Sequence, residues 1–240
     1  MRTIGLLGGM SWESTAVYYR RINEQVRDRL GGLHSAEVLM RSVNFEGIVA
    51  LQKADAWDEA AAALVALARD LEKAGAACIV ICTNTMHKLA DAVQRGVSIP
   101  LLHIADATAE AVKRDGMRRP LLLATRYTME QDFYLSRLRE THGLDLMVPE
   151  RDDRTTVHDI IFNELCCGTV REASRKRYID IIDRGRANGA DSVILGCTEI
   201  GLLIGPEHLD LPLFDSTLIH ADAAVRFSLA PDHAPRQNAA

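Results

Sequence analysis

The sequence predicts an α/β protein of two pseudo-symmetric lobes, each with a parallel sheet of about four strands flanked by helices, and a candidate active site in the cleft between the lobes. Apolar strand-like segments alternate with helical segments along the chain, which is typical of parallel sheets covered on both faces. The segment GAACIVICTNT at 75–85 also recurs as GADSVILGCTE at 189–199. Internal duplication constrains a fold strongly, and here it indicates two similar lobes.

The repeat aligns Thr83 with Cys197, each of them directly after an apolar strand-like run. The copies also share the segment that follows, because IPLL at 99–102 matches LPLF at 211–214. We therefore expect Thr83 and Cys197 to lie at corresponding strand tips of the two lobes.

In the first half of the chain, the apolar run 3–7 predicts a central strand, and Ser11 is suited to cap a helix that stops at Gly31. The segment 58–73 is rich in Ala, Leu and Glu and predicts another helix. The other elements expected here are strands at 37–43, 77–82 and 99–104, helices at 84–93 and 106–113, and a loop from 45 to 52.

A second round of alternation begins at residue 120. Gly143 ends an amphipathic segment at 129–141, which predicts a helix there. The other expected elements are strands at 120–124, 144–148, 192–195 and 211–214, helices at 159–165, 171–184 and 217–227, and a frayed tail from Pro231.

The composition of the 240 residues is that of an ordinary globular protein. The net charge of −5 provides no basic field, so nucleic acid is not an expected partner. No apolar run approaches the roughly 20 residues of a membrane helix, and the short run at 3–7 is unlike a signal sequence. We expect no membrane association and a cytoplasmic location.

The five cysteines are Cys78, Cys82, Cys166, Cys167 and Cys197, an odd number that argues for free thiols. Their spacings do not fit a structural zinc site, and we expect no metal. The first four are interpreted as small buried hydrophobic residues. Cys197 differs because it stands at a strand end before a polar pair, where side chains meet ligand.

A helix beginning directly after Cys197 favours the thiolate form of its side chain. A second group at the equivalent place in the other lobe would act on the opposite face of one substrate atom. Inversion through a planar intermediate needs this arrangement, because one group removes a proton and the other returns it. The backbone N–H groups suited to hold a carboxylate are those of Asn84, Thr85, Thr198 and Glu199.

Three segments resemble a known family: GGMSWEST at 8–15, CTNTMH at 82–87 and GCTEI at 196–200 look like the signatures of the aspartate/glutamate racemase family. The resemblance runs from Ile4 to about Phe227. It implies a racemase that needs no cofactor, with one catalytic cysteine from each lobe and a small amino acid, aspartate or glutamate, as substrate. It also suggests Met10 and Gln52 as substrate contacts and a homodimer as the assembly.

The resemblance further implies how the chain divides into lobes. The strand beginning near Ile99 crosses into the second lobe, and the C-terminal helix returns to the first. Lobe 1 would then comprise residues 1–98 and 212–240, and lobe 2 residues 99–211.

The sequence departs from the family pattern at Thr83, where the first catalytic cysteine is expected. Cys82 lies one residue earlier, and a shift of one residue along a strand points a side chain to the opposite face. We therefore expect Cys197 to be the main base and acid, on the face that handles the L-enantiomer. Thr83 would be a weaker partner on the other face, relaying a proton through water or donating to the intermediate.

Simpler interpretations stay open for several of these residues. Thr83 is compatible with a helix cap, Cys197 with an inert buried thiol, and Glu199 with a first-turn helix acid. Met10 is compatible with core packing alone, and Gln52 rests on the resemblance. His87 is expected to be a satisfied histidine near the site rather than a proton carrier, whereas Arg126 either pairs with a distal carboxylate or is solvated.

Other functions also stay open. A decarboxylase or a cis–trans isomerase of a small dicarboxylate would suit the same fold with one cysteine. A ligand-binding protein that has lost turnover would suit it as well, and so would a racemase of neutral amino acids.

Overall fold

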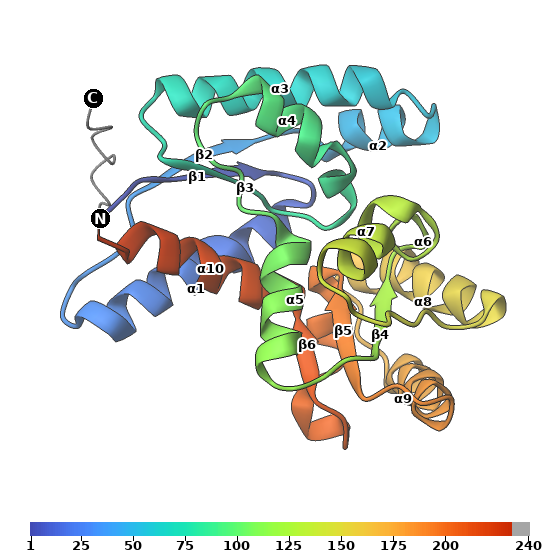
Figure 1. Ribbon diagram of the computed structural model, residues 1–240. Coiled ribbons are helices and arrows are strands. Elements are labelled where there is room, and N and C mark those ends of the chain that lie inside the picture. The colour runs from blue at the N-terminus through green and yellow to red at the C-terminus, as the bar shows by residue number, and fades with distance from the viewer. Residues whose placement is uncertain (232–240) are drawn as a thin grey trace.

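The computed structural model describes residues 1–231, which form two parallel sheets flanked by helices (Figure 1). The strand orders are β2-β1-β3 and β4-β5-β6. A bridge from Leu101 to Ile79 extends the first sheet, and one from Met147 to Leu121 extends the second. The strands are β1 (Ile4–Gly8), β2 (Val38–Ser42), β3 (Cys78–Ile81), β4 (Pro120–Ala124), β5 (Ser192–Gly196) and β6 (Leu213–Asp215). The predicted fold class is confirmed, with three strands and one bridging segment in each sheet.

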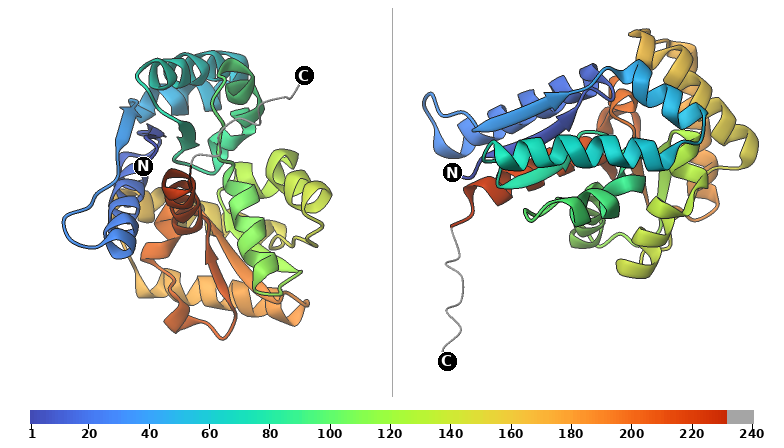
Figure 2. Two further views of the ribbon diagram at one scale, coloured as in Figure 1. Left: turned by 60° about the vertical axis from the view of Figure 1, so that its left-hand side comes forward. Right: turned by 90° about the horizontal axis from the view of Figure 1, so that it is seen from above.

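Helices cover both faces of the first sheet. One face packs on α3 and α4, and the other on α1 and α10, which lie side by side in Figures 1 and 2. The helices of this half are α1 (Trp12–Leu30), α2 (Phe45–Lys53), α3 (Trp57–Lys73), η1 (Thr85–Leu89) and α4 (Ala90–Gly96), with α10 (Ser216–Leu229) from the far end of the chain.

A single apolar core fills the second lobe, where α5 contacts β6 and α8 contacts β4. Its helices are α5 (Ile104–Arg114), α6 (Arg126–Glu130), α7 (Asp132–Ser136), η2 (Arg137–Thr141), α8 (Arg151–Asn163), η3 (Leu165–Cys167), α9 (Glu172–Ala187), η4 (Thr198–Leu202) and η5 (Pro206–His208). These helices place the carboxyl ends of β4 and β5 toward the first lobe (Figure 1).

The duplication seen in the sequence recurs as an identical hydrogen bond in each lobe. The N–H of Ile79 donates to the carbonyl of Pro100 over 2.9 Å, and the N–H of Val193 donates to that of Pro212 over the same distance. The sheets are therefore built by one plan, with β3 corresponding to β5.

The chain crosses between the lobes twice. It leaves the first sheet after the bridge at Leu101 and enters α5. It remains in the second sheet through β6, which pairs with β5, and α10 then packs on α1. The exact lobe boundaries, at 98/99 and 211/212, remain predictions.

Several predicted elements differ from the structure. Residues 45–52, expected as a loop, are helical, because the Asn44 side chain caps α2 by accepting from the N–H of Glu46. The helix expected at 129–141 is split into α6, α7 and η2, since Gln131 has extended backbone. The strands expected at 99–104 and 144–148 are reduced to isolated bridges. The predicted tail lies outside the described residues beyond Pro231.

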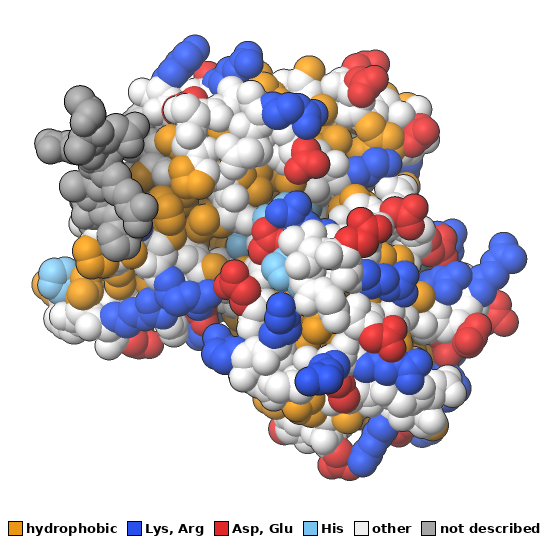
Figure 3. Space-filling view, in the orientation of Figure 1, with side chains coloured by type: hydrophobic (Ala, Val, Ile, Leu, Met, Phe, Trp, Pro, Cys, Tyr) orange, Lys and Arg blue, Asp and Glu red, His pale blue; other side chains and the backbone are white. Residues whose placement is uncertain are grey.

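The face of the molecule in Figure 3 carries acidic and basic side chains intermixed. Such a surface has no field of one sign to attract a polyanion. None of the helices within residues 1–231 is long and apolar enough to cross a membrane.

The turn between β1 and α1 brings Met10 and Ser11 to the edge of the sheet, and Gly9 makes it possible. Gly9 has φ of +85°, and a Cβ on it would lie 2.3 Å from the carbonyl oxygen of Val43. Its N–H donates to Thr15 Oγ1 over 2.8 Å, and the Ser11 side chain caps α1. The turn therefore needs both a positive φ and a residue without a side chain.

We predict that Gly9→Ala destabilises the protein much more than Gly116→Ala. Gly116 has a similar φ of +79°, but nothing lies within 4 Å of its added Cβ. The control should lose about 1–2 kcal/mol of the free energy of unfolding from backbone strain, whereas Gly9→Ala should lose roughly 1–3 kcal/mol more from overpacking. Urea denaturation measures both, and equal losses would contradict the crowding described for this turn.

Candidate active site

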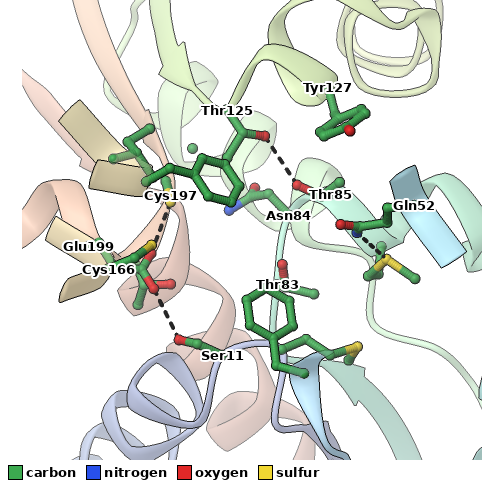
Figure 4. Close-up of a pocket in the computed structure, with 17 residues that line it drawn as sticks. Ser11, Gln52, Thr83, Asn84, Thr85, Thr125, Tyr127, Cys166, Cys197 and Glu199 are labelled. Carbon is green, nitrogen blue, oxygen red and sulfur yellow. Dashed lines mark hydrogen bonds between the residues drawn. The ribbon is translucent and has the colours of Figure 1, made fainter. Parts of the chain in front are cut away.

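A pocket lies between the lobes at the carboxyl ends of the strands (Figure 4). All four polar turns that follow β1, β3, β4 and β5 contribute to it. It contains every predicted site residue: Met10, Gln52, Thr83, Asn84, Thr85, Cys197, Thr198 and Glu199. The structure thus brings these residues together, as expected for parallel sheets whose strand ends face each other.

Thr83 and Cys197 enter the pocket from different lobes (Figure 4). Thr83 directly follows Cys82 at the end of β3, and Cys197 follows β5 as the N-cap residue of η4. Cys82 is fully buried among side chains of α1 and α10 and lies on the other face of the strand. Cys78 is likewise buried in this core. A thiol is therefore present on only one side of the pocket at the strand tips.

A carboxylate is the main partner of the Cys197 thiol. Cys197 Sγ donates to Glu199 Oε2 over 2.9 Å, and Ser11 Oγ donates to Glu199 Oε1 over 3.1 Å. Glu199 is only 8% exposed, and these two bonds hold its carboxylate in the wall of the pocket. Ser11 comes from the opposite lobe, and the chain of bonds therefore crosses the cleft.

The expectation of a thiolate at Cys197 is wrong for the structure as it stands. Burial, together with the charge of Glu199 and the hydrogen bond to it, raises the pKa of the Cys197 thiol well above its ordinary value. The N–H of Glu199 acts in the other direction but does not outweigh these effects. Since η4 is one short turn of 3-10 helix, its dipole is a weak source of compensation. The thiol is protonated at neutral pH, and Glu199 is placed to accept its proton.

Hydroxyl groups form most of the other contacts across the cleft. Thr85 Oγ1 lies 3.2 Å from Thr125 Oγ1 and 3.4 Å from Thr128 Oγ1. On the other side of the pocket, Ser14 is hydrogen-bonded to Thr198. These three contacts between neutral hydroxyl groups therefore flank the pocket and join the lobes.

The two side-chain amides of the pocket, those of Asn84 and Gln52, differ in the strength of their hydrogen bonds. Asn84 Nδ2 donates to Ser216 Oγ over 3.1 Å, and Ser216 Oγ in turn donates to the carbonyl of Leu195 over 2.7 Å. Gln52 Nε2 instead donates to Met86 Sδ over 3.0 Å, and a thioether is a weak acceptor. Asn84 is thus a structural link between the lobes, whereas Gln52 is free to turn to a better acceptor.

The pocket is nearly free of charged side chains. Among the described residues that line it, Glu199 is the one Asp or Glu, and none is Lys, Arg or His. Arg126 is exposed and lies outside the lining, although its neighbours Thr125 and Tyr127 belong to it. Within residues 1–231, no group of three or more His, Cys, Asp or Glu side chains is placed to hold a metal ion.

Part of the lining was missed by the sequence analysis. Cys166, interpreted as buried, is exposed and lines the pocket beside Glu199, and Cys167 is exposed as well (Figure 4). The other lining residues not predicted are Ser11, Phe45, Met86, Thr125, Tyr127, Ile161, Phe162 and Gly196. Thr125 and Tyr127 directly follow β4. No sequence signal marks the lining residues of α2 and α8, because their place depends on how these helices fold over the cleft.

The model of the Asp/Glu/Hydantoin racemase family matches residues 7–224. The chain belongs to this family. The prediction that the protein is an isomerase acting on amino acids is confirmed at the level of the family.

Within the Asp/Glu/Hydantoin racemase family, a candidate Asp/Glu racemase of Yersinia pestis is 49% identical and superposes with a TM-score of 0.92, covering 96% of this chain and all of its own. An aspartate racemase homologue from Pyrococcus horikoshii is 34% identical, with a TM-score of 0.85 over 95% of this chain and 99% of its own. The broad specificity amino-acid racemase RacX of Bacillus subtilis is 22% identical over 95% of this chain and 98% of its own.

We predict that Glu199→Gln lowers the pKa of Cys197. The substitution removes the negative charge that disfavours a thiolate, so a larger fraction of the thiol is ionised at neutral pH. Alkylation by iodoacetamide, followed at the Cys197 peptide by mass spectrometry from pH 6 to 10, should show its midpoint at lower pH than in the unaltered protein. Cys167, which is exposed and outside the pocket, serves as the internal control. An unchanged midpoint at Cys197 would contradict the carboxylate effect.

Proposed function

We propose that this chain racemises an amino acid without a cofactor, using Cys197 on one face of the α-carbon and Thr83 on the other. The observation that carries the proposal is the Cys197–Glu199 hydrogen bond opposite Thr83 in a pocket between two equivalent strand tips. Family membership supports the reaction class.

The proposed reaction begins with proton transfer from Cys197 to Glu199. The 2.9 Å contact allows the carboxylate to take the thiol proton as substrate binds. The thiolate then removes the α-proton of the L-enantiomer and becomes a thiol again. Glu199 later returns its proton to solvent.

Reprotonation on the other face is assigned to Thr83. Its hydroxyl has no hydrogen-bond partner in the described part of the chain, so it is available to a water or to the intermediate. A threonine hydroxyl is a far weaker acid than a thiol, and it would pass a proton from solvent rather than hold a charge. One proton enters from solvent and one leaves, so the cycle balances.

The planar intermediate carries its charge on the α-carboxylate. First-turn N–H groups of η1 and η4, at Thr85 and Thr198, have no acceptor within their own helices. Together with the hydroxyls of the same residues, they are suited to bind that carboxylate. We therefore propose Thr85 and Thr198 as the main carboxylate contacts, and the substrate-binding roles expected for Asn84 and Glu199 remain predictions.

Aspartate and glutamate are the substrates with which the proposal starts, because relatives from Yersinia and Pyrococcus carry these names. Gln52 and Tyr127 lie across the pocket from Cys197 (Figure 4) and are neutral donors for the distal group. Met10 contributes an apolar wall that is 4% exposed. A pocket with neutral donors fits an acidic side chain and its amide about equally well.

We predict that Cys197→Ser lowers exchange of the α-proton of L-aspartate or L-glutamate in deuterated water by about 10²–10⁴-fold, the usual contribution of a positioned base. Thr83→Val should retain exchange but lose D-product, and Thr83→Cys should raise racemisation. Proton NMR with chiral chromatography measures both quantities. Carbon dioxide or an isomerised dicarboxylate in place of exchange would support a decarboxylase or an isomerase, and no exchange or turnover with any amino acid would support a binding protein.

We also predict a small preference between aspartate and asparagine. No cation among the described lining residues distinguishes a carboxylate from an amide, so kcat/KM for the two should agree to within about tenfold, the size of a weak hydrogen-bond difference. A preference for aspartate above a hundredfold would mean that a cation reaches the pocket. Arg126→Gln is the matched control, because Arg126 is the cation next to two lining residues.

A further inference from the structure

The buried histidine behind Thr83 has both ring nitrogens engaged by backbone. His87 Nδ1 lies 2.7 Å from the carbonyl oxygen of Thr83, and the N–H of Ile104 donates to His87 Nε2 over 3.2 Å. Because Nε2 accepts a hydrogen bond, Nδ1 carries the proton and donates it to Thr83. The two contacts thus fix one neutral tautomer.

The imidazole is not a proton carrier for the pocket. It is 3% exposed and does not line the pocket. Burial, reinforced by the neighbouring His103 and His220 and by Arg137, lowers the pKa of His87 well below its ordinary value. The ring is therefore neutral, and its contribution is geometric.

The direction of the Thr83 hydroxyl depends on the backbone of its turn. The N–H of Thr83 donates to the carbonyl of Ile81 over 2.9 Å, and its carbonyl accepts from His87. No side-chain bond from Thr83 itself is present in the part of the chain that the structure describes. Loss of the hydrogen bond from His87 would leave the Thr83 carbonyl without a side-chain donor, and the turn would be free to shift.

The same imidazole connects the turn to both crossings between the lobes. Ile104 is the first residue of α5, and the ring of His87 lies 5.4 Å from that of His220 in α10. His220 Nε2 donates to the carbonyl of Leu102, and Tyr18 OH donates to His220 Nδ1, over 2.7 and 2.8 Å. The Thr83 turn is thus tied to the segments that set the distance between the lobes.

We propose that His87 is a positioning residue for Thr83, which aims the Thr83 hydroxyl into the pocket and holds it in register with the second lobe. The inference rests on the proposed role of Thr83 in returning the proton. His87 should affect only the inversion step, because the Cys197 thiol is hydrogen-bonded to Glu199 and not to the His87 ring.

Two substitutions separate the contacts of His87. The amide nitrogen of asparagine lies near the place of Nδ1, so His87→Asn retains the donor to Thr83 and loses the acceptor for Ile104. Glutamine extends toward the place of Nε2, so His87→Gln loses the donor to Thr83. His220→Asn is the matched control, because it alters the same cluster without touching Thr83.

The measurement is the ratio of D-product formed to α-proton exchanged, with the full chain and an L-amino acid in deuterated water. We expect His87→Gln to lower this ratio roughly 10–100-fold, the cost of a small misplacement of a reacting group. His87→Asn and His220→Asn should leave it within about threefold, although both lower the melting temperature. Proportional loss of exchange and inversion in His87→Gln would overturn the proposal and leave a purely structural role.

A second measurement keeps the inference testable if His87→Gln does not fold. Imidazole ¹⁵N spectra of the unaltered protein should show His87 protonated at Nδ1 across pH 5–8. Protonation at Nε2 would overturn the proposal. Thr83→Val tests the proposed role of Thr83 separately. If this variant forms D-product at the unaltered rate, the role of Thr83 is wrong, whatever the result for His87.

Discussion

Hydrogen bonds across the cleft hold the carboxyl ends of the two sheets against each other, and the pocket depends on them. Ser11 meets Glu199, Thr85 meets Thr125, and Asn84 meets Ser216. Each bond alone contributes about 1 kcal/mol, which is small beside the two apolar cores. Their value lies in placing strand tips from separate sheets to within reach of one substrate atom, as a near-attack geometry requires.

In the proposed mechanism, Cys197 rests as an unreactive thiol until substrate binds. A half-buried thiol beside a carboxylate holds its proton, and so Cys197 is a poor target for stray electrophiles and oxidants. In the proposed reaction, the same carboxylate accepts the thiol proton when substrate binds. Protection and activation therefore come from one neighbour, and the energetic cost of forming the thiolate is moved to the bound state.

The sequence was a good guide where a signal was local or repeated. The duplication placed Thr83 and Cys197 at equivalent strand tips, and strand alternation correctly put Cys82 on the core side. The sequence failed where long-range packing decides. No pattern shows that Cys166 on η3 reaches the pocket, or that Glu199 points back at Cys197 and reverses the effect of the helix end. Protonation states depend on such neighbours, which periodicity does not reveal.

The position of α10 has a consequence for how the protein is made. Ala221, Ala224 and Val225 of this helix complete the core that Tyr18 and Val26 of α1 begin. During synthesis these partners emerge from the ribosome nearly 200 residues apart. One face of the N-terminal sheet therefore stays incompletely covered until the end of the chain has been synthesised. The second lobe can fold before then. A stalled or shortened chain would expose this apolar face and would be a substrate for chaperones and proteases.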